Sequence, residues 1–197
     1  MQPQITFSDD KEYMDVLIEI EEGEQYRVGE ISLQGDLLRE KGELFSLFKL
    51  KQGDVFSREI LRGDVTVLND LYANQGYAYV NVSPVTRLDH EERLVNILYD
   101  IEQGIQVSID RIRITGNTRT RDKIIRRQMH LLEGELYNAS LIKSSRSKIN
   151  NLGFFEEVNV STSKGKDEAH LDMDVEVKEK PTGTFSIGAV SYTHLRA

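Results

Sequence analysis

Cysteine and tryptophan are both absent from the 197 residues of the chain. Without cysteine, neither a disulfide framework nor a thiolate metal site can form, and the redox compartment of the protein stays open. Without tryptophan, and with aromatic residues at only 8% of the sequence, there is no obvious aromatic platform for binding carbohydrate. The fold must therefore bury enough apolar surface to be stable without covalent cross-links.

Basic residues and long apolar runs are also scarce. Lysine and arginine number 25 against 33 acidic residues, which gives a formal net charge of -8. Nonspecific nucleic-acid binding needs a cationic surface that displaces counterions, so nucleic acid is not an expected partner. No segment approaches the roughly 18 apolar residues that span a bilayer, and the N-terminal residues lack the basic and apolar regions of a secretory signal. If the protein is exported, we expect the signal to lie upstream of this sequence.

The residue patterns of known catalytic and metal sites are missing too. The four histidines have no spacing that would place two of them on one helix face: His90, His130, His170 and His194. The sequence has no phosphate-binding glycine loop, nucleophile elbow or H-E-x-x-H motif. We therefore predict no catalytic residue, no metal and no cofactor, and we interpret the chain as a scaffold or binding protein.

What the sequence does contain is a repeat. Glycines recur at an offset of 81 positions with similar residues around them: Gly23 and Gly104, Gly35 and Gly116, Gly53 and Gly134. Before the second pair, the apolar alternation changes parity between Val28 and Ile31 and again between Ile109 and Ile112. A unit of about 80 residues is large enough for its own core, so the repeat predicts tandem domains with a β-bulge in the first strand of each.

Each copy predicts the element order β-α-α-β-β. A strand ends at the second glycine of the repeat, two helices follow, and two strands then form a hairpin. The helices are predicted at 37–48 and 58–74 in the first copy and at 121–129 and 140–152 in the second; the hairpin strands are predicted at 78–87 with 94–101, and at 156–164 with 169–178. The predicted fold class is α+β, in which a three-stranded sheet is covered on one face by two helices.

The longer helix of the first copy has a clear apolar stripe. Leu61, Val65, Leu68 and Tyr72 follow one another at helical spacing and are expected to face the sheet. Ser57 is the predicted N-cap of this helix, because its hydroxyl can accept from a free backbone N–H of the first turn.

Residues 1–22 repeat only the end of the pattern. The alternation before Gly23 matches the alternation before Gly104, so we interpret 1–22 as the C-terminal strands of a truncated preceding copy. The complete copies then occupy 24–103 and 106–180. Only about three or four residues separate neighbouring copies, which predicts joints that bend but do not behave as flexible linkers.

Several motifs together resemble the POTRA domain, the polypeptide-transport-associated module of outer-membrane assembly and translocation proteins. They are the order β-α-α-β-β, the strand-ending glycines, and the aromatic that follows each helix-stopping glycine. The stretches IRRQMHLLEGELY, LGFFEEV and VEVKEKPTGTFSIG are similar to the last POTRA domain of the BamA family and its entry into a membrane barrel. On this resemblance 24–103 is the penultimate domain, 106–180 is the last, 181–189 begins the first barrel strand, and 190–197 is a tail that cloning could have added.

The resemblance implies a function and partners. It implies a non-enzymatic scaffold at the periplasmic face of the Gram-negative outer membrane, attached through a C-terminal barrel, that assists the folding and insertion of outer-membrane β-barrels. It also implies a BamD-like lipoprotein and other assembly-complex lipoproteins as partners, and unfolded outer-membrane proteins as clients. One alternative is the POTRA region of a different translocation protein, such as TamA or a two-partner secretion transporter. Another is an RNA-binding KH-like module, which is disfavoured because neither inter-helix segment contains the required GXXG loop.

The expected partner site lies in the second copy, where the charge is uneven. Residues 107–134 contain seven basic and three acidic residues, and Arg126 and Arg127 are our candidates for contact with an acidic partner or lipid headgroups. A solvated helix face is the alternative interpretation. By resemblance, Glu133 occupies the acidic position expected to meet a basic residue of the BamD-like lipoprotein, and its alternative role is that of a surface glutamate in a turn.

A client site is expected at a strand edge. A three-stranded sheet leaves unpaired N–H and C=O groups on at least one strand, and an extended peptide can pair there through sequence-independent hydrogen bonds. The candidate edges are residues 79–85 and the segment Val158, Asn159, Val160, Ser161, Thr162. Pro84 would remove a donor from the first edge, so we favour the second. A guarded edge that binds no ligand is the alternative.

Overall fold

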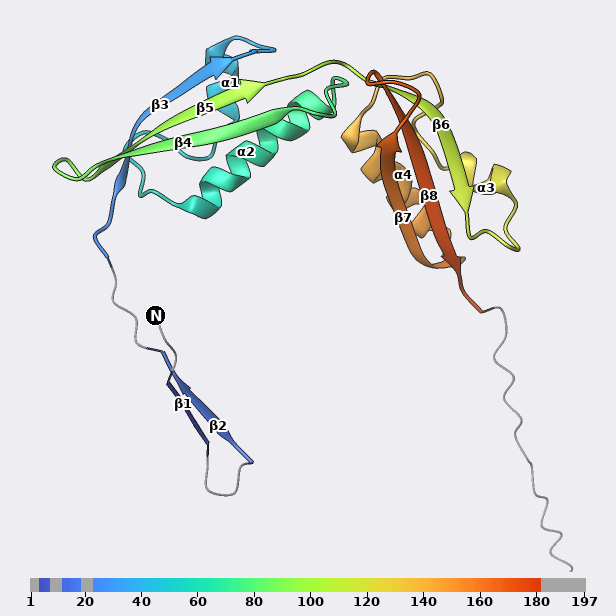
Figure 1. Cartoon of the computed structure of the whole chain (residues 1–197), viewed down its shortest axis with the longest axis horizontal. Helices are drawn as coiled ribbons and strands as arrows, with labels where there is room; N and C mark the ends of the chain where they lie inside the picture. Colours follow the sequence, from blue (N-terminus) through green and yellow to red (C-terminus); the bar gives the residue numbers. More distant parts are fainter. Residues whose placement is uncertain (1–3, 8–11, 19–22, 182–197) are drawn as a thin grey trace, which may run out of the picture.

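The computed structural model describes residues 4–7, 12–18 and 23–181 of the chain. Within these ranges the strands form one two-stranded sheet and two three-stranded sheets. Figure 1 shows that each three-stranded sheet has its own helices, and that the second sheet with its helices follows directly on the first. We call these units the first module, residues 24–103, and the second module, residues 106–180.

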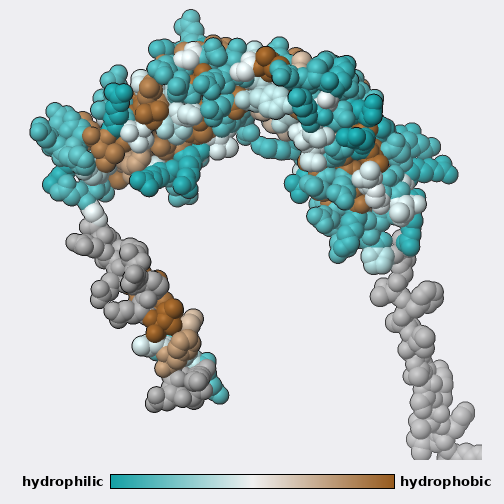
Figure 2. Space-filling model, in the orientation of Figure 1, coloured by the Kyte–Doolittle hydropathy of each residue, from teal (hydrophilic) through white to brown (hydrophobic). Residues whose placement is uncertain are grey.

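The N-terminal hairpin pairs β1 (Gln4–Phe7) antiparallel with β2 (Met14–Leu17). Its apolar side chains are exposed, Phe7 to 66% and Leu17 to 58%, and they form the brown area on this hairpin in Figure 2. The assignment of residues 1–22 to a truncated copy stays a prediction. The predicted barrel strand at 181–189, apart from Pro181, and the predicted tail at 190–197 lie outside the described residues.

The first module has the predicted element order. Its elements are β3 (Arg27–Gly35), α1 (Lys41–Leu47), α2 (Arg58–Ala73), β4 (Asn81–Asp89) and β5 (Leu94–Glu102). The sheet order is β3-β5-β4, with β3 parallel and β4 antiparallel to β5. The register shifts between Val28 and Ile31, which confirms the predicted bulge. In a regular strand, residues on the same face are an even number of positions apart. The shift breaks this rule, so Val28 and Leu33 are both buried although their numbers differ by an odd number.

The second module repeats this architecture. Its elements are β6 (Ser108–Thr115), α3 (Asp122–Arg126), α4 (Ala139–Asn150), β7 (Phe155–Lys164) and β8 (His170–Glu179). The sheet order is β6-β8-β7, with β6 parallel and β7 antiparallel to β8. A register shift between Ile109 and Arg111 gives β6 the same bulge as β3.

The helices cover one face of each sheet, as Figure 1 shows, and the predicted α+β class is confirmed. On α2, Leu61, Leu68 and Tyr72 are buried in the core of the first module, and Val65 is half-buried against it. The Ser57 hydroxyl accepts from the Ile60 N–H at 3.4 Å, so the predicted N-cap is confirmed. The second module has a separate core around Met173 and Val175 of β8.

The first helix of each module is shorter than predicted. Helix α1 begins at Lys41 rather than at residue 37, and α3 ends at Arg126 rather than at residue 129. After Arg126 the chain continues with i to i-3 hydrogen bonds, from Gln128 to the Ile125 carbonyl and from Met129 to the Arg126 carbonyl. This tighter turn carries the chain away from the α-helical path.

The joint between the modules is hydrogen-bonded. The Val107 N–H donates to the Gly76 carbonyl at 2.9 Å. The end of α2 meets the start of α4: Asn138 Nδ2 donates to the Asn74 carbonyl at 2.9 Å, and the Ser140 N–H donates to Asn74 Oδ1 at 2.9 Å. Lys143 and Asp70 form an ion pair at 3.0 Å across the same contact. This joint agrees with the restricted motion expected of so short a connection.

Candidate functional site

The sheet of the second module has two outer strands, and the predicted site residues lie at both. β8 is the central strand, so β6 and β7 each have one edge that no strand of the sheet covers. The predicted client segment, Val158 to Thr162, lies within β7. Glu133 and Arg126 instead bond to Ile112 of β6, and Arg127 follows Arg126 at the end of α3. The structure therefore places Glu133 and Arg126 at one edge of the sheet and the candidate client segment at the opposite edge.

The register identifies the peptide groups that face outward on β7. Gly116, the residue after β6, lies against the Val177 carbonyl, so the Val177 peptide groups point toward β6 rather than toward β7. Val158 pairs with Val177, so the Val158 peptide groups are not bonded to β8 and face the free edge. The direction of the backbone N–H and C=O groups alternates from one residue to the next along an antiparallel strand. The groups of Val158, Val160 and Thr162 therefore point away from β8, and we call these three residues the outward set of β7.

The corresponding edge in the first module lacks one donor. There Val82 pairs with Ile101, and the Ile101 carbonyl accepts from the Asp36 N–H on the β3 side at 2.9 Å. Val82 and Pro84 therefore belong to the outward set of β4. Proline has no N–H, so the backbone of β4 lacks one outward donor, whereas the backbone of β7 has a donor and an acceptor at each outward position. This geometry agrees with the preference for β7.

A groove runs beside β7 along α4. It has a volume of about 440 Å³, and seven residues line it: Lys143, Arg146, Ser147, Asn150, Glu156, Glu157 and Val158. The four helical residues recur at i, i+3, i+4 and i+7, so they share one face of α4. An extended peptide paired with β7 would have this polar groove available for its side chains.

Glu133 and Arg126 meet at one residue of the β6 edge. Glu133 lies in the segment between α3 and α4, and its Oε1 accepts from the Ile112 N–H at 2.8 Å. Arg126 Nη2 donates to the Ile112 carbonyl at 2.9 Å. The two side chains also form a long ion pair of 3.7 Å, and they are 42% and 48% exposed for Arg126 and Glu133 respectively. They thus occupy both outward peptide groups of Ile112 while keeping part of their charged surface in water.

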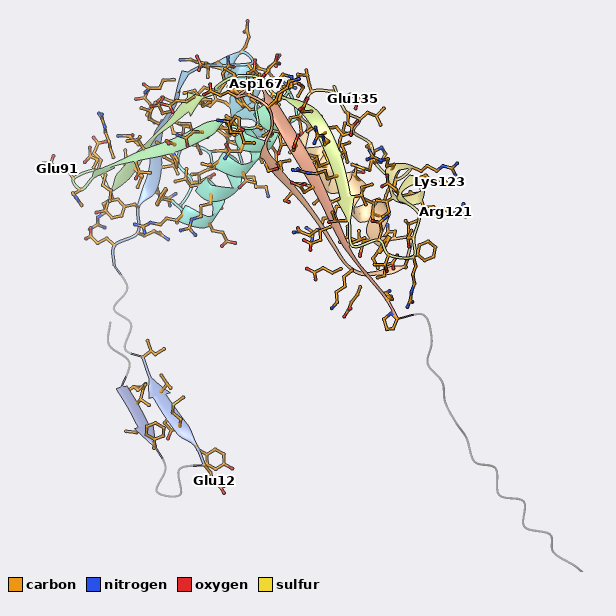
Figure 3. The ribbon with its side chains drawn as sticks, turned by 45° about the vertical axis from the view of Figure 1, so that its right-hand side comes forward. Glu12, Glu91, Arg121, Lys123, Glu135 and Asp167 are labelled. Atoms are coloured by element: carbon orange, nitrogen blue, oxygen red, sulfur yellow. The ribbon has the colours of Figure 1, made fainter. Side chains whose placement is uncertain are left out.

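The remaining basic residues divide into paired and exposed ones. Arg113 forms ion pairs with Asp174 at 2.7 Å and Asp172 at 3.3 Å across the open face of the sheet, and hydrogen bonding to Asp174 raises the pKa of Arg113. Arg127 is exposed at the end of α3. Figure 3 shows Arg121 and Lys123 on the outer side of the second module, beside α3. Around α3 the basic stretch therefore exposes Arg121, Lys123 and Arg127, and none of these three forms an ion pair with another described residue.

A carboxylate anchors the loop that leads into α3. Glu179, the last residue of β8, accepts from the Thr120 N–H at 2.7 Å, the Arg119 N–H at 3.0 Å and the Thr118 hydroxyl at 2.8 Å. These hydrogen bonds, first the one from the Thr120 backbone, lower the pKa of Glu179 to about 2. The anchor joins the end of β8 to the segment that places α3 and Arg126. Sequence reasoning missed it, because a strand-ending glutamate gives no sign of which loop it reaches.

The described ranges contain no cluster of three or more histidine or acidic side chains that could hold a metal ion. Among the same residues, no helix combines the length and the apolar character needed to cross a bilayer.

Family and sequence comparisons agree with this architecture. The POTRA model, described as "Surface antigen variable number repeat", matches residues 26–104 and 107–180. The outer membrane protein assembly factor BamA of Neorickettsia risticii is 36% identical over 177 residues, which cover 87% of this chain and 23% of that protein. The BamA of Nitratidesulfovibrio vulgaris is 29% identical over 88% of this chain and 22% of its own length. The chain thus spans less than a quarter of these curated relatives.

Solved structures extend the likeness to the arrangement of the domains. The crystal structure of Haemophilus influenzae BamA POTRA3-5 matches 90% of this chain and 71% of that chain, with a TM-score of 0.80 and 25% identity. BamA from Haemophilus ducreyi lacking POTRA domains 1-3 matches 81% of this chain and 30% of that chain, with a TM-score of 0.70 and 26% identity. The predicted resemblance is confirmed, and POTRA domains of BamA lie in the periplasm, attached to the outer membrane. The chain belongs to the POTRA family.

Proposed function

We propose that the two POTRA domains act as a periplasmic scaffold in outer-membrane protein assembly, and that the β7 edge receives extended segments of unfolded outer-membrane proteins. The observation that supports this proposal is the free edge of β7, whose outward peptide groups at Val158, Val160 and Thr162 lie beside the groove along α4. The likeness to BamA supports the general role in assembly.

Strand addition suits such a client for a physical reason. Barrel strands differ in sequence but share an extended backbone of about 10 residues with alternating apolar and polar side chains. Backbone hydrogen bonds to an open edge do not depend on sequence, so one edge can receive many strands. The affinity for each strand stays low, because most of the contact energy offsets the entropy of ordering the client.

A peptide titration tests the client edge. We expect a synthetic ten-residue peptide with alternating apolar and polar residues to shift the backbone amide signals of Val158, Val160 and Thr162 in the ¹⁵N-labelled chain. A matched ten-residue peptide made only of proline has no internal N–H group to donate to the β7 carbonyls and is expected to leave these signals unchanged. Shifts confined to β4, or no shifts at all, would contradict the proposed client edge.

For the partner lipoprotein, we propose that Glu133 and Arg127 face a BamD-like protein at the β6 side of the second module. The half-exposed Glu133 carboxylate supports this role, because its Ile112 bond leaves acceptor capacity on the same group. Arg127 is exposed, and no hydrogen bond or ion pair joins its side chain to another described residue. Arg126 has a mixed role, since Ile112 and Asp122 already engage its guanidinium.

The variant Glu133→Gln separates a partner contact from an internal one. Glutamine keeps an oxygen that can accept from the Ile112 N–H, but it removes the negative charge. If the carboxylate pairs with a basic residue of a BamD-like lipoprotein, we expect binding to weaken about 10-fold or more, the usual effect of losing a charge-assisted hydrogen bond. Calorimetric titration of purified BamD with each chain measures this effect. If the affinity for BamD and the amide spectrum are both unchanged, Glu133 bonds only to Ile112 within the chain, and the proposed partner contact is wrong.

A further inference from the structure

Arg146 of α4 engages the edge that the proposed function assigns to the client. Its Nε–H donates to the Val158 carbonyl oxygen at 2.9 Å. Val158 belongs to the outward set of β7, so this oxygen is one of the acceptors that an added strand would need. The guanidinium and the backbone N–H of a client strand therefore compete for the same acceptor.

The two modules differ at this position in an informative way. Their second helices align over the 81-residue offset, because Asp64 and Ser145 accept from equivalent backbone groups, the Lys49 and His130 N–H. The next residue is Val65 in the first module and Arg146 in the second. Valine has no donor, so position 65 of α2 cannot bond to a carbonyl of β4 as Arg146 of α4 bonds to β7.

The two edges are thus protected against pairing in different ways. On β4, Pro84 permanently removes one outward donor. On β7, the Arg146 side chain occupies one outward acceptor, and the strand backbone keeps all of its donors and acceptors. Exposed edges invite unwanted pairing, and both proline and charged side chains are known protections against it. Only the protection by Arg146 is reversible, because its hydrogen bond can break without any change in the sequence or backbone of the strand.

The surroundings of Arg146 allow this withdrawal. Arg146 is an exposed residue, and the groove beside it gives its side chain room to move away from Val158. Glu157 lines the same groove and can receive the released guanidinium, whereas Glu156, which also lines it, is already ion-paired with Lys178 at 3.0 Å. The hydrogen bond from Arg146 is therefore exchangeable for a solvated or ion-paired state at small cost.

We infer that Arg146 is a reversible latch on the β7 edge: it closes the edge when no client is bound, and an extended client strand must displace it from the Val158 carbonyl. This inference rests on the proposed client site. It predicts that removing the guanidinium strengthens binding of an extended peptide, whereas a residue that contacts the client directly would weaken binding when removed.

The test uses the full 197-residue chain and the alternating ten-residue peptide. We expect Arg146→Met to bind the peptide about fivefold more tightly than the unchanged chain, which corresponds to the net contribution of one competing hydrogen bond. Lys148→Met is the matched control, because it removes one positive charge from the same helix outside the groove, and its affinity is expected to equal that of the unchanged chain. Dissociation constants follow from the shifts of the β7 amide signals.

A second measurement needs no substitution. In the unchanged chain, the Arg146 Nε–H is expected to exchange with water more slowly without peptide than at saturating peptide. If β7 amides shift while Arg146→Met binds equally or more weakly, or while the Nε–H stays protected, the latch is overturned and strand addition stands. If no β7 amide shifts in any chain, the proposed client edge is wrong and the latch is wrong with it.

Discussion

Replacing Gly116 by alanine is expected to unfold the second module while the first stays folded. Gly116 follows the last residue of β6 and has a φ of +83°, and a Cβ atom added there would lie 1.9 Å from the Val177 carbonyl oxygen. No side-chain movement can relieve this contact, because the obstacle is the backbone of the central strand. We expect a loss of about 4 kcal/mol or more, which is most of the stability of a module of this size.

A matched variant separates the clash from the backbone strain. Gly134 has a similar φ of +89°, but nothing lies within 4 Å of an added Cβ. Gly134→Ala is therefore expected to cost only the left-handed conformation, about 1 to 2 kcal/mol. Urea unfolding followed by amide signals of each module measures both changes. Equal destabilisation by the two variants would show that the approach to Val177 is unimportant.

Gly35 provides the same test in the first module. Its φ is +91°, and an added Cβ would lie 2.0 Å from the Ile101 carbonyl oxygen. Gly35→Ala should therefore unfold the first module and spare the second. This pair of results would show that the 81-residue repeat marks two cores that fold separately, each closed by a glycine against its central strand.

The sequence predicted those parts of the fold that depend on local periodicity. The bulge between Val28 and Ile31 was predictable because a change of parity in an apolar alternation has few other causes. The boundaries of α2 followed from its apolar stripe and from the Ser57 cap. That the sheet leaves free edges followed from its size, since three strands leave two edges, but only the strand order of the structure shows that β7 is one of the edge strands.

The contacts that give the site its chemistry were not predictable in this way. Glu133 and Ile112 are 21 positions apart, and Arg126 reaches the same residue from a different element. The anchoring of the 118–120 loop by Glu179 spans about 60 positions. Such side-chain to backbone contacts depend on the final placement of α3 against β6, and no periodic signal reports that placement. The resemblance could indicate Glu133 as a contact position, but not that it also occupies the β6 edge.

The two modules also differ in how they hold the segment between their helices. In the first module, the buried Asp64 carboxylate accepts from the Lys49 N–H at 2.7 Å and the Leu50 N–H at 3.1 Å. In the second, the Ser145 hydroxyl accepts from the His130 N–H at 2.8 Å and donates to the Leu141 carbonyl at 2.7 Å. The Asp64 carboxylate only accepts and satisfies two donors here, whereas the Ser145 hydroxyl accepts from one donor and also donates its own proton to a carbonyl. The segment held by Ser145 is the one that leads to Glu133.

Asp64→Ala is therefore expected to destabilise the first module by about 3 kcal/mol or more, because two backbone N–H groups lose their buried acceptor. Asp64→Ser, which installs the residue of the second module, should recover part of the loss by accepting one of the two bonds.

Ser145→Ala is expected to destabilise the second module by about 1 to 3 kcal/mol and to increase the mobility of the segment before Glu133. Urea unfolding and amide exchange at Leu50 and His130 measure these effects, and an Asp64→Ala chain as stable as the unchanged one would show that water reaches the buried N–H groups and replaces the carboxylate.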